Sequence, residues 1–447
     1  MNAIKKTLIH SHESESHFLL SKTDTVGISE LKPEESIDAD EVIKSAFPDL
    51  RSGIDFIDYA NQQLADTNNF SAMVIRRDPG NQDGNRAGLP DEGGGHVGVA
   101  GILDERCRKE NGLWGQLETG LFGSFFPGKN RSDALDLARD IQAKVVEKTA
   151  GTVTIGLASF PTLTYQRSEI IANARKALDH AAFFGANSLT AFDDVSLNIS
   201  GDKLFEKGNI QEAINEFKLA LELDPGNVNV RNSLGVCYGL QSQYDLAIDE
   251  FKQAIAIDPD EYMALYNLGL IHLLVDQPDR ALGYFLDAEK INPDSYEVAF
   301  QTGKLYLERG NLKKSRPYLQ HAAELEPASG QIYRYLGDCY AANHNLAAAT
   351  AAYKKAIKHN PHDAAALSAL GSLFDDQGEN PEITRMFLRE SIKLSPNNGH
   401  YHYRLGRHFS GQNRLDEALK AFVKARSFGY DAADDIKKIK KRIRTQK

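Results

Sequence analysis

The sequence predicts two kinds of structure in one chain, an α/β or α+β domain followed by a solenoid of helix pairs. Prolines recur from Pro225 to Pro396 at a spacing of 34 residues four times and then 35, and glycines keep the same spacing from Gly235 to Gly406. A fixed period of this length is typical of stacked repeats. Strand-like and helix-like segments alternate between residues 70 and 192, which favours a sheet packed against helices.

One period accounts for a pair of helices. In the copy at residues 228–261, Leu234 and Tyr238 share one face of the first helix, and Phe251 lies between small residues on one face of the second. Pro259 ends the second helix, because the residue before a proline is pushed out of the α-helical region. We count seven copies between residues 195 and 430, and the sixth has one extra residue.

This pattern of Leu-Gly, Tyr, Ala, an aromatic residue, Ala and Pro at fixed offsets resembles the tetratricopeptide repeat. The signature returns with the same offsets around Gly269, Gly337 and Gly406. The resemblance covers a little over half of the chain. It implies a superhelix in which the first helices of successive repeats line a concave groove, and in this family the groove binds extended or helical peptides.

The residues expected to face this groove lie three positions before and one position after each repeat glycine. They are Asn232 and Val236, Tyr266 and Leu270, Phe300 and Lys304, Arg334 and Asp338, Ser368 and Ser372, and Tyr403 and Arg407. The early positions are mostly apolar or aromatic, and the later ones carry cations with one acid. We expect a protein or peptide partner with an apolar anchor and some acidic character. The alternative is a solvated inner face with no selected partner.

Ahead of the repeats, four strands and four helical segments are expected. The strands are residues 70–75, 122–126, 152–160 and 188–192. The helical segments are one that begins near Asp40, with an apolar face of Ile54, Ile57, Ala60 and Leu64, and then residues 97–107, 132–148 and 168–184. Ser132 is the expected N-cap of its helix, Gly185 is expected to end the last one, and residues 79–95 are expected to be a loop.

The end of this region resembles a GGDEF domain, the fold of diguanylate cyclases. The matching segments are residues 154–161 (Thr-Ile-Gly-Leu-Ala-Ser-Phe-Pro), similar to the family's SIGVA strand; residues 174–178 with Ala181, Gly185 and Asn187, similar to the helix that follows; and residues 122–128, which fit the strand after the signature motif. The resemblance spans roughly residues 45–195 and is strongest over residues 152–192.

The residues that such a cyclase needs for catalysis are replaced. The resemblance places the carboxylate pair of the signature at Gly120 and Leu121, the metal-binding aspartates near Arg76 and Asp78, the phosphate-binding cations at Ala182 and Ala186, and the product-inhibition pair at Lys109 and Gly112. Phosphoryl transfer depends on metal ions and cations that position and neutralise phosphate. We therefore expect a protein that is not an enzyme, and we assign it no catalytic residue, cofactor or metal.

Two other glycine motifs are weak. Residues 123–129 match the start of a P-loop, but Asn130 stands where a Ser or Thr must hold Mg²⁺. Residues 93–98 match G-x-G-x-x-G without following a strand directly, so a flexible loop is the favoured interpretation.

Cysteines and histidines add no clear site. Cys107, Cys237 and Cys339 lack metal-binding spacing and are interpreted as buried, small apolar residues. His10, His12 and His17 lie among Ser and Glu, where a solvated tail is favoured over a metal site.

Composition limits the partners and the compartment. The 447 residues carry a net charge of −10 and a pI near 5.8, which argues against general affinity for nucleic acid. No apolar run approaches the roughly 20 residues that span a bilayer, so we expect a cytoplasmic protein. The expected divisions are a polar, flexible segment at 1–44, the GGDEF-like domain at 45–194, the repeats at 195–430, and a basic capping helix at 431–447 that docks through Ile436, Ile439 and Ile443.

These observations predict a non-enzymatic adaptor. The repeats bind a protein partner, and the degenerate GGDEF-like domain supplies a second interaction or dimer surface. The alternative is a signalling adaptor in which that domain still binds GTP or cyclic di-GMP and relays this to the repeats.

Overall fold

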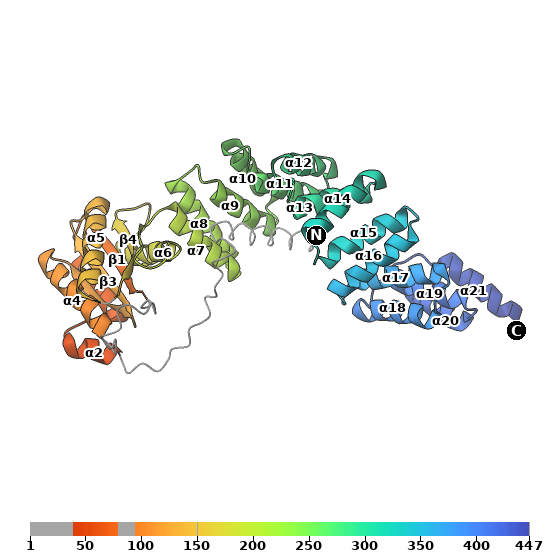
Figure 1. Cartoon of the computed structure of the whole chain (residues 1–447), viewed down its shortest axis with the longest axis horizontal. Coiled ribbons are helices and arrows are strands. Elements are labelled where there is room, and N and C mark those ends of the chain that lie inside the picture. The colour runs from red at the N-terminus through yellow and green to blue at the C-terminus, as the bar shows by residue number, and fades with distance from the viewer. Residues whose placement is uncertain (1–38, 79–93, 150, 447) are drawn as a thin grey trace. The chain divides into compact units, whose positions relative to one another are not determined.

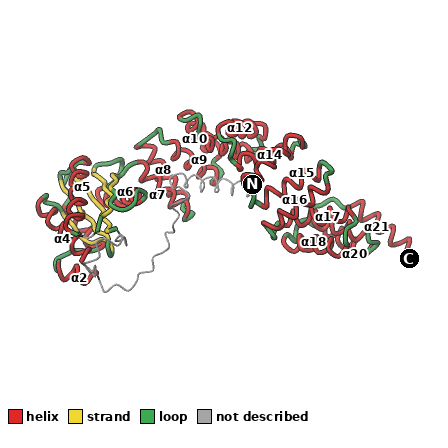
Figure 2. The backbone as a smooth tube through the Cα atoms, in the orientation of Figure 1, coloured by secondary structure: helices red, strands yellow, loops and turns green. Residues whose placement is uncertain are grey.

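The computed structural model describes residues 39–78, 94–149 and 151–446 (Figure 1). Two compact units make up the chain, Met1–Ile271 and His272–Lys447. The described strands all belong to the first unit, and the described part of the second unit is helical (Figure 2). The division falls inside the repeats rather than at Asp194, so the domain limits drawn from the sequence stay a prediction.

The first unit begins with a sheet domain. Its elements are α2 (Ala39–Ala46), α3 (Gly53–Gln63), β1 (Phe70–Arg77), α4 (Gly94–Lys109), β2 (Leu113–Glu118), β3 (Leu121–Pro127), α5 (Arg131–Lys148), β4 (Val153–Phe160), the 3-10 turn η1 (Arg167–Glu169), α6 (Ile170–Ala182) and β5 (Leu189–Ala191). The strand order is β2-β3-β1-β4-β5. Strand β1 runs antiparallel to both neighbours, and β5 runs parallel to β4. The chain thus follows a β-α-β-β-α-β path before its last helix and strand.

Both faces of this sheet are covered. Because side chains alternate along a strand, Met73 and Ile75 of β1 join a core with α2, α4 and α5, while Gly156 of β4 faces the backbone of α6. On that second face, the Phe56 ring of α3 lies 5.8 Å from the Phe125 ring of β3. A strand buried on both faces is expected to be mostly apolar, and the run from Phe70 to Ile75 is apolar except for the buried Ser71.

The structure confirms the expected strands and helices, with five corrections. Strand β2 was not predicted. Asn130 rather than Ser132 caps α5, because its Oδ1 accepts a hydrogen bond from the Asp133 amide at 3.0 Å. Ile54 is 76% exposed, and Phe56 takes its place in the core. Residues 39–44, expected to be flexible, belong to α2, where Ile43 is buried. The loop expected at residues 79–95 is shorter at its end, because α4 begins at Gly94. Residues 79–93 lie outside the described residues.

Fourteen helices follow between residues 194 and 427, as seven successive pairs. They are α7 (Asp194–Glu206) with α8 (Ile210–Leu223), α9 (Val228–Leu240) with α10 (Tyr244–Ile257), α11 (Tyr262–Leu274) with α12 (Pro278–Ile291), α13 (Tyr296–Glu308) with α14 (Leu312–Leu325), α15 (Gly330–Ala342) with α16 (Leu346–His359), α17 (Ala364–Gln377) with α18 (Pro381–Leu394), and α19 (Gly399–Gly411) with α20 (Leu415–Ser427).

A last helix, α21 (Ala433–Gln446), covers the end of the repeats as predicted. Ile436 and Ile439 are buried there against Leu405, Phe409 and Phe422, and Ile443 is half-buried at the same cluster. The helix therefore seals an apolar face that the final pair would otherwise expose.

The three cysteines are buried and unpaired, as the sequence predicted. None of the helices that the structure describes is long and apolar enough to cross a bilayer.

Candidate partner-binding surface

A recurring contact sets the distance between the two helices of a pair. A Cβ added at Gly235 would lie 2.7 Å from the Phe251 ring, and one at Gly337 would lie 2.6 Å from the Tyr353 ring. Gly201 lies against Phe217 in the same way, so the first pair carries the period one step before Gly235. The helices hold each other through this face, which leaves other positions of the first helices to face outward. We call the positions three before and one after each glycine the first-helix face.

In the first unit, the first-helix face is buried. Val236 and Leu270 are both 0% exposed, and Asn232 and Tyr266 are buried as well. Asn267 Nδ2 donates a hydrogen bond to Asn232 Oδ1 at 3.0 Å. A partner role for these four residues stays a prediction.

In the second unit, the same positions are charged and more open. The side chains of Lys304, Asp338 and Arg407 are 18%, 37% and 49% exposed. Phe300 is buried and packs against Tyr335, with 5.3 Å between ring centroids. The Lys304 ammonium lies 5.6 Å from the centroid of the Tyr335 ring, so an aromatic and cationic surface links α13 to α15.

Arg334 is the centre of a polar network. Its Nε lies 3.1 Å from Asp363, the N-cap of α17, and its Nη1 lies 3.6 Å from Asp338. The Tyr353 hydroxyl donates a hydrogen bond to Asp338 at 2.7 Å. Burial raises the pKa of Asp338, although this hydrogen bond and Arg334 oppose the rise. Arg334 is thus already neutralised by two carboxylates.

The end of the face is formed by α19. Arg407 Nη2 lies 3.0 Å from Asp376 on α17, so this cation is paired too. The Tyr403 ring lies 4.5 Å from the Tyr430 ring. Arg404 Nη1 donates a hydrogen bond to the Ser368 hydroxyl at 3.0 Å. The structure therefore joins most of the predicted residues of α13, α15, α17 and α19 into one run of contacts. Sequence reasoning missed Arg404, which stands next to the predicted Tyr403.

The phosphate-site positions of the sheet domain have structural roles. Gly120 forms the turn between β2 and β3 with φ of +73°, and Leu121 is buried in β3. Asp78 is 3% exposed and accepts hydrogen bonds from Thr152 Oγ1, Thr154 Oγ1 and the Asn187 amide at 2.7, 2.6 and 2.7 Å. This carboxylate ties the end of β1 to β4 and to the turn before β5.

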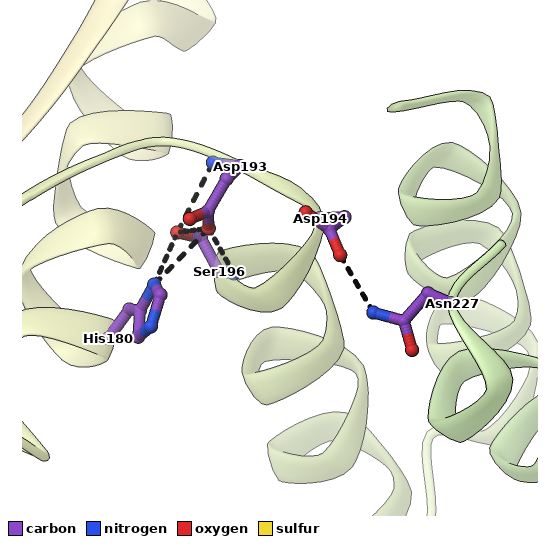
Figure 3. Close-up of polar contacts among 5 residues, drawn as sticks. All are labelled: His180, Asp193, Asp194, Ser196 and Asn227. Carbon is purple, nitrogen blue, oxygen red and sulfur yellow. Dashed lines mark hydrogen bonds and ion pairs between the residues drawn. The ribbon is translucent and has the colours of Figure 1, made fainter. Parts of the chain in front are cut away.

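A Ser-His-Asp group lies where the sheet domain meets the first helix pair (Figure 3). His180 Nδ1 is 3.2 Å from Asp193 Oδ1 and 3.5 Å from Ser196 Oγ, and Ser196 Oγ donates to Asp193 at 2.7 Å. In a catalytic triad the acid and the nucleophile contact opposite imidazole nitrogens. Here both contact Nδ1, and Asp193 is the N-cap of α7, so the group positions a helix.

No group of three or more His, Cys, Asp and Glu side chains suited to a metal ion occurs among the described residues. His10, His12 and His17 lie outside them.

Comparison with known proteins identifies the repeats. Residues 201–242 and 238–275 match a family model described as TPR repeat, and residues 300–358 and 341–382 match one described as tetratricopeptide repeat. The chain contains tetratricopeptide repeats. Proteins with these repeats bind peptides or other proteins. No curated protein sequence matches the chain.

Several solved structures are similar to part of the chain. YrrB, a TPR protein with an unusual peptide-binding site, is 25% identical over 40% of this chain and 91% of its own, with a TM-score of 0.34. PilF of Pseudomonas aeruginosa is 18% identical over 49% of this chain and 97% of its own, with a TM-score of 0.45. A tetratricopeptide repeat protein from Parabacteroides merdae is 18% identical over 55% and 96%, with a TM-score of 0.42.

Proposed function

We propose that this protein is a non-catalytic cytoplasmic adaptor that binds a protein or peptide through the first-helix face of its second unit. The observation that carries the proposal is the run of half-exposed cations and tyrosines from Lys304 to Arg407. Aromatic and arginine side chains are enriched where proteins bind one another. The second helices and the repeat glycines hold the fold, so these side chains are available to a ligand.

Affinity capture tests this role. The full chain is used as bait in a lysate of its source cells, and the bound proteins are quantified by mass spectrometry. Lys304→Glu with Arg407→Glu should remove the partner, because both substitutions reverse charge on the face. The control is Lys358→Glu with Lys420→Glu, two exposed lysines on second helices. Equal capture by both double variants, or loss only in the control, would contradict the proposed face.

We also propose that residues 45–194 are a degenerate GGDEF domain that acts as a second interaction or dimer surface. The β-α-β-β-α-β path and the residues quoted for the resemblance support this proposal. Analytical ultracentrifugation at tens of micromolar tests the dimer. A single monomeric species at all concentrations would contradict it without affecting the role of the repeats.

A further inference from the structure

Arg404, two positions before Gly406 and so beside the first-helix face, differs from the other cations of the first helices in the second unit. The lysines and arginines of α13, α15, α17 and α19 are Lys304, Arg334, Arg404 and Arg407, and all four helices are described throughout. Three of these cations lie within 4.0 Å of a carboxylate. Arg404 has no such partner among the described residues, and its contact is the hydroxyl of Ser368.

The rest of the Arg404 guanidinium is accessible. The Ser368 side chain is fully buried, so it can offer this cation one neutral acceptor and no charge. None of the Arg404 nitrogens is among the buried polar atoms that lack a partner. The donors that do not reach Ser368 are therefore open to solvent or to a ligand.

The nearest acid does not act as a counter-ion for Arg404. Asp338 lies close enough to act on Arg404 through space, but it already accepts the Tyr353 hydroxyl and lies 3.6 Å from Arg334. Burial lowers the pKa of Arg404, although Tyr353 and Asp338 partly offset it. A half-buried charge without a counter-ion is unfavourable, and a carboxylate that pairs with the guanidinium fork relieves it.

Aromatic side chains next to Arg404 define the rest of the ligand. The rings of Tyr403, the preceding residue, and Tyr430 form a tilted pair, and Tyr403 is half-buried against Phe422. Such rings bind apolar side chains well and lose little conformational entropy on binding.

We propose that Arg404, oriented by Ser368, binds the carboxylate of an Asp or Glu side chain in an extended segment of the partner, with an apolar or aromatic residue beside it on Tyr403. This inference rests on the proposed function and names the chemistry of its ligand. The arginines predicted from the sequence, Arg334 and Arg407, already have carboxylate partners.

The test uses the full chain and a phage-displayed library of random linear peptides. Peptides enriched on the wild-type chain are synthesised with both ends blocked, so that an acidic side chain is the only carboxylate. Their affinities are measured by fluorescence polarisation, for each peptide and for its Glu→Gln or Asp→Asn form, against wild type, Arg404→Gln and Arg426→Gln. Thermal melting verifies that each variant is folded.

We expect the enriched peptides to share an acid next to an apolar residue. Replacing that acid should weaken binding to wild type about tenfold or more, the effect of losing a charge-assisted hydrogen bond. On Arg404→Gln the same replacement should change affinity less than about twofold, because the two groups act as a pair. Arg426→Gln, at an exposed arginine on the second helix α20, is the matched control and should keep the full acid dependence. If Arg404→Gln does not fold, Arg404→Lys replaces it. Lysine keeps the charge, so this variant should lose less of the acid dependence than a glutamine at this position would.

Two results would overturn the inference. In the first, replacing the acid of an enriched peptide lowers its affinity equally for wild type and for Arg404→Gln. The face would then bind peptides, but Arg404 would not bind the acidic side chain. A library that yields no enriched peptide would contradict the proposed function, and the inference with it.

Discussion

The sheet domain and the last helix pair differ in how fully their buried charged groups are hydrogen-bonded. Asp78 of the sheet domain is enclosed by three donors, from Thr152 just before β4, Thr154 in β4 and the turn before β5. Arg404 of the last repeat has one neutral acceptor. The sheet domain therefore uses its charge to hold its own strands together, whereas the repeat leaves a charge for something else to neutralise.

This difference follows from how each region is built. A sheet covered on both faces has one interior, and every polar group inside it must be satisfied there. A helix pair needs only the stripe around its glycine and aromatic residue, so its outward positions are free to vary. We therefore expect substitutions in the sheet domain to act on folding and those on the first-helix face to act on binding.

The largest effect is expected at Gly156, where an added Cβ would overlap the backbone of Ala174 and Leu178 in α6. Gly156→Ala should destabilise the sheet domain by about 3 kcal/mol or more, because neither backbone can move aside cheaply. Trp114 of β2 is the chain's one tryptophan and reports this domain in denaturant titrations followed by fluorescence.

Gly101→Ala is the matched control for that substitution. Gly101 lies in α4 with nothing within 4 Å of an added Cβ, so alanine should stabilise by up to about 1 kcal/mol. Identical unfolding midpoints for the two variants would contradict the packing of β4 on α6.

A somewhat smaller effect is expected at Asp78. Asp78→Ala leaves the hydroxyl of Thr154, itself buried, without its acceptor, and should cost about 2–3 kcal/mol by the same fluorescence measurement. The exposed Asp136, paired with Arg139 one helical turn away, is the control and should change stability by less than about 0.5 kcal/mol.

The satisfied state of Asp78 also predicts how the sheet domain responds to nucleotides. Since its carboxylate is already bonded, calorimetric titration of the full chain with GTP or cyclic di-GMP, with and without Mg²⁺, should show no binding. Saturable heat would favour the nucleotide-sensing alternative.

Gly337→Ala tests the helix pairs. The added Cβ would meet the Tyr353 ring at 2.6 Å, and a ring can shift where backbone cannot, so the cost should be about 1–2 kcal/mol. Far-UV circular dichroism should show earlier unfolding of the helices, while the Trp114 transition stays in place. Gly283→Ala in α12, with nothing within 4 Å, is the control. A shifted Trp114 transition would mean that repeats and sheet domain unfold together.

The smallest effect is expected at the junction. Burial alone would raise the pKa of Asp193, but hydrogen bonds from His180 and Ser196 outweigh it and hold the pKa below its ordinary value of 3.8. A lowered pKa means that Asp193 contributes full stability above pH 3.8 and loses it as the pH falls below that value. Asp193→Asn should cost about 1 kcal/mol near neutral pH through the weakened cap, and should remove part of this acid sensitivity.

Ser329→Ala is the control for the junction. Ser329 caps α15 through its Oγ, which accepts from the Ile332 amide at 3.4 Å and contacts no carboxylate among the described residues. Its loss should lower stability by the same amount at every pH. Parallel pH curves for wild type and Asp193→Asn would show that the cap's charge does not matter.

Much of the fold could be predicted because the relevant signals are local. These signals are the 34-residue period, the alternation of strand-like and helix-like segments, and the glycines at helix ends. Each reflects contacts between residues close in sequence or repeated along it. Strand β2 gave no such signal. It is short, contains Gly115 and has partly exposed ends, so its pairing with β3 defines it.

The sequence by itself determined the helix pairs and the central strands of the sheet, since residue type and spacing are sufficient for these. Tertiary structure decided which charges pair between helices, whereas the partners in Lys304–Glu308 and Arg334–Asp338 are four residues apart on one helix. Arg334 and Arg407 look as available as Arg404 in the sequence, but their acids come from the neighbouring helix pair. Ion pairing depends on distances across helices, and no pattern along one helix contains them.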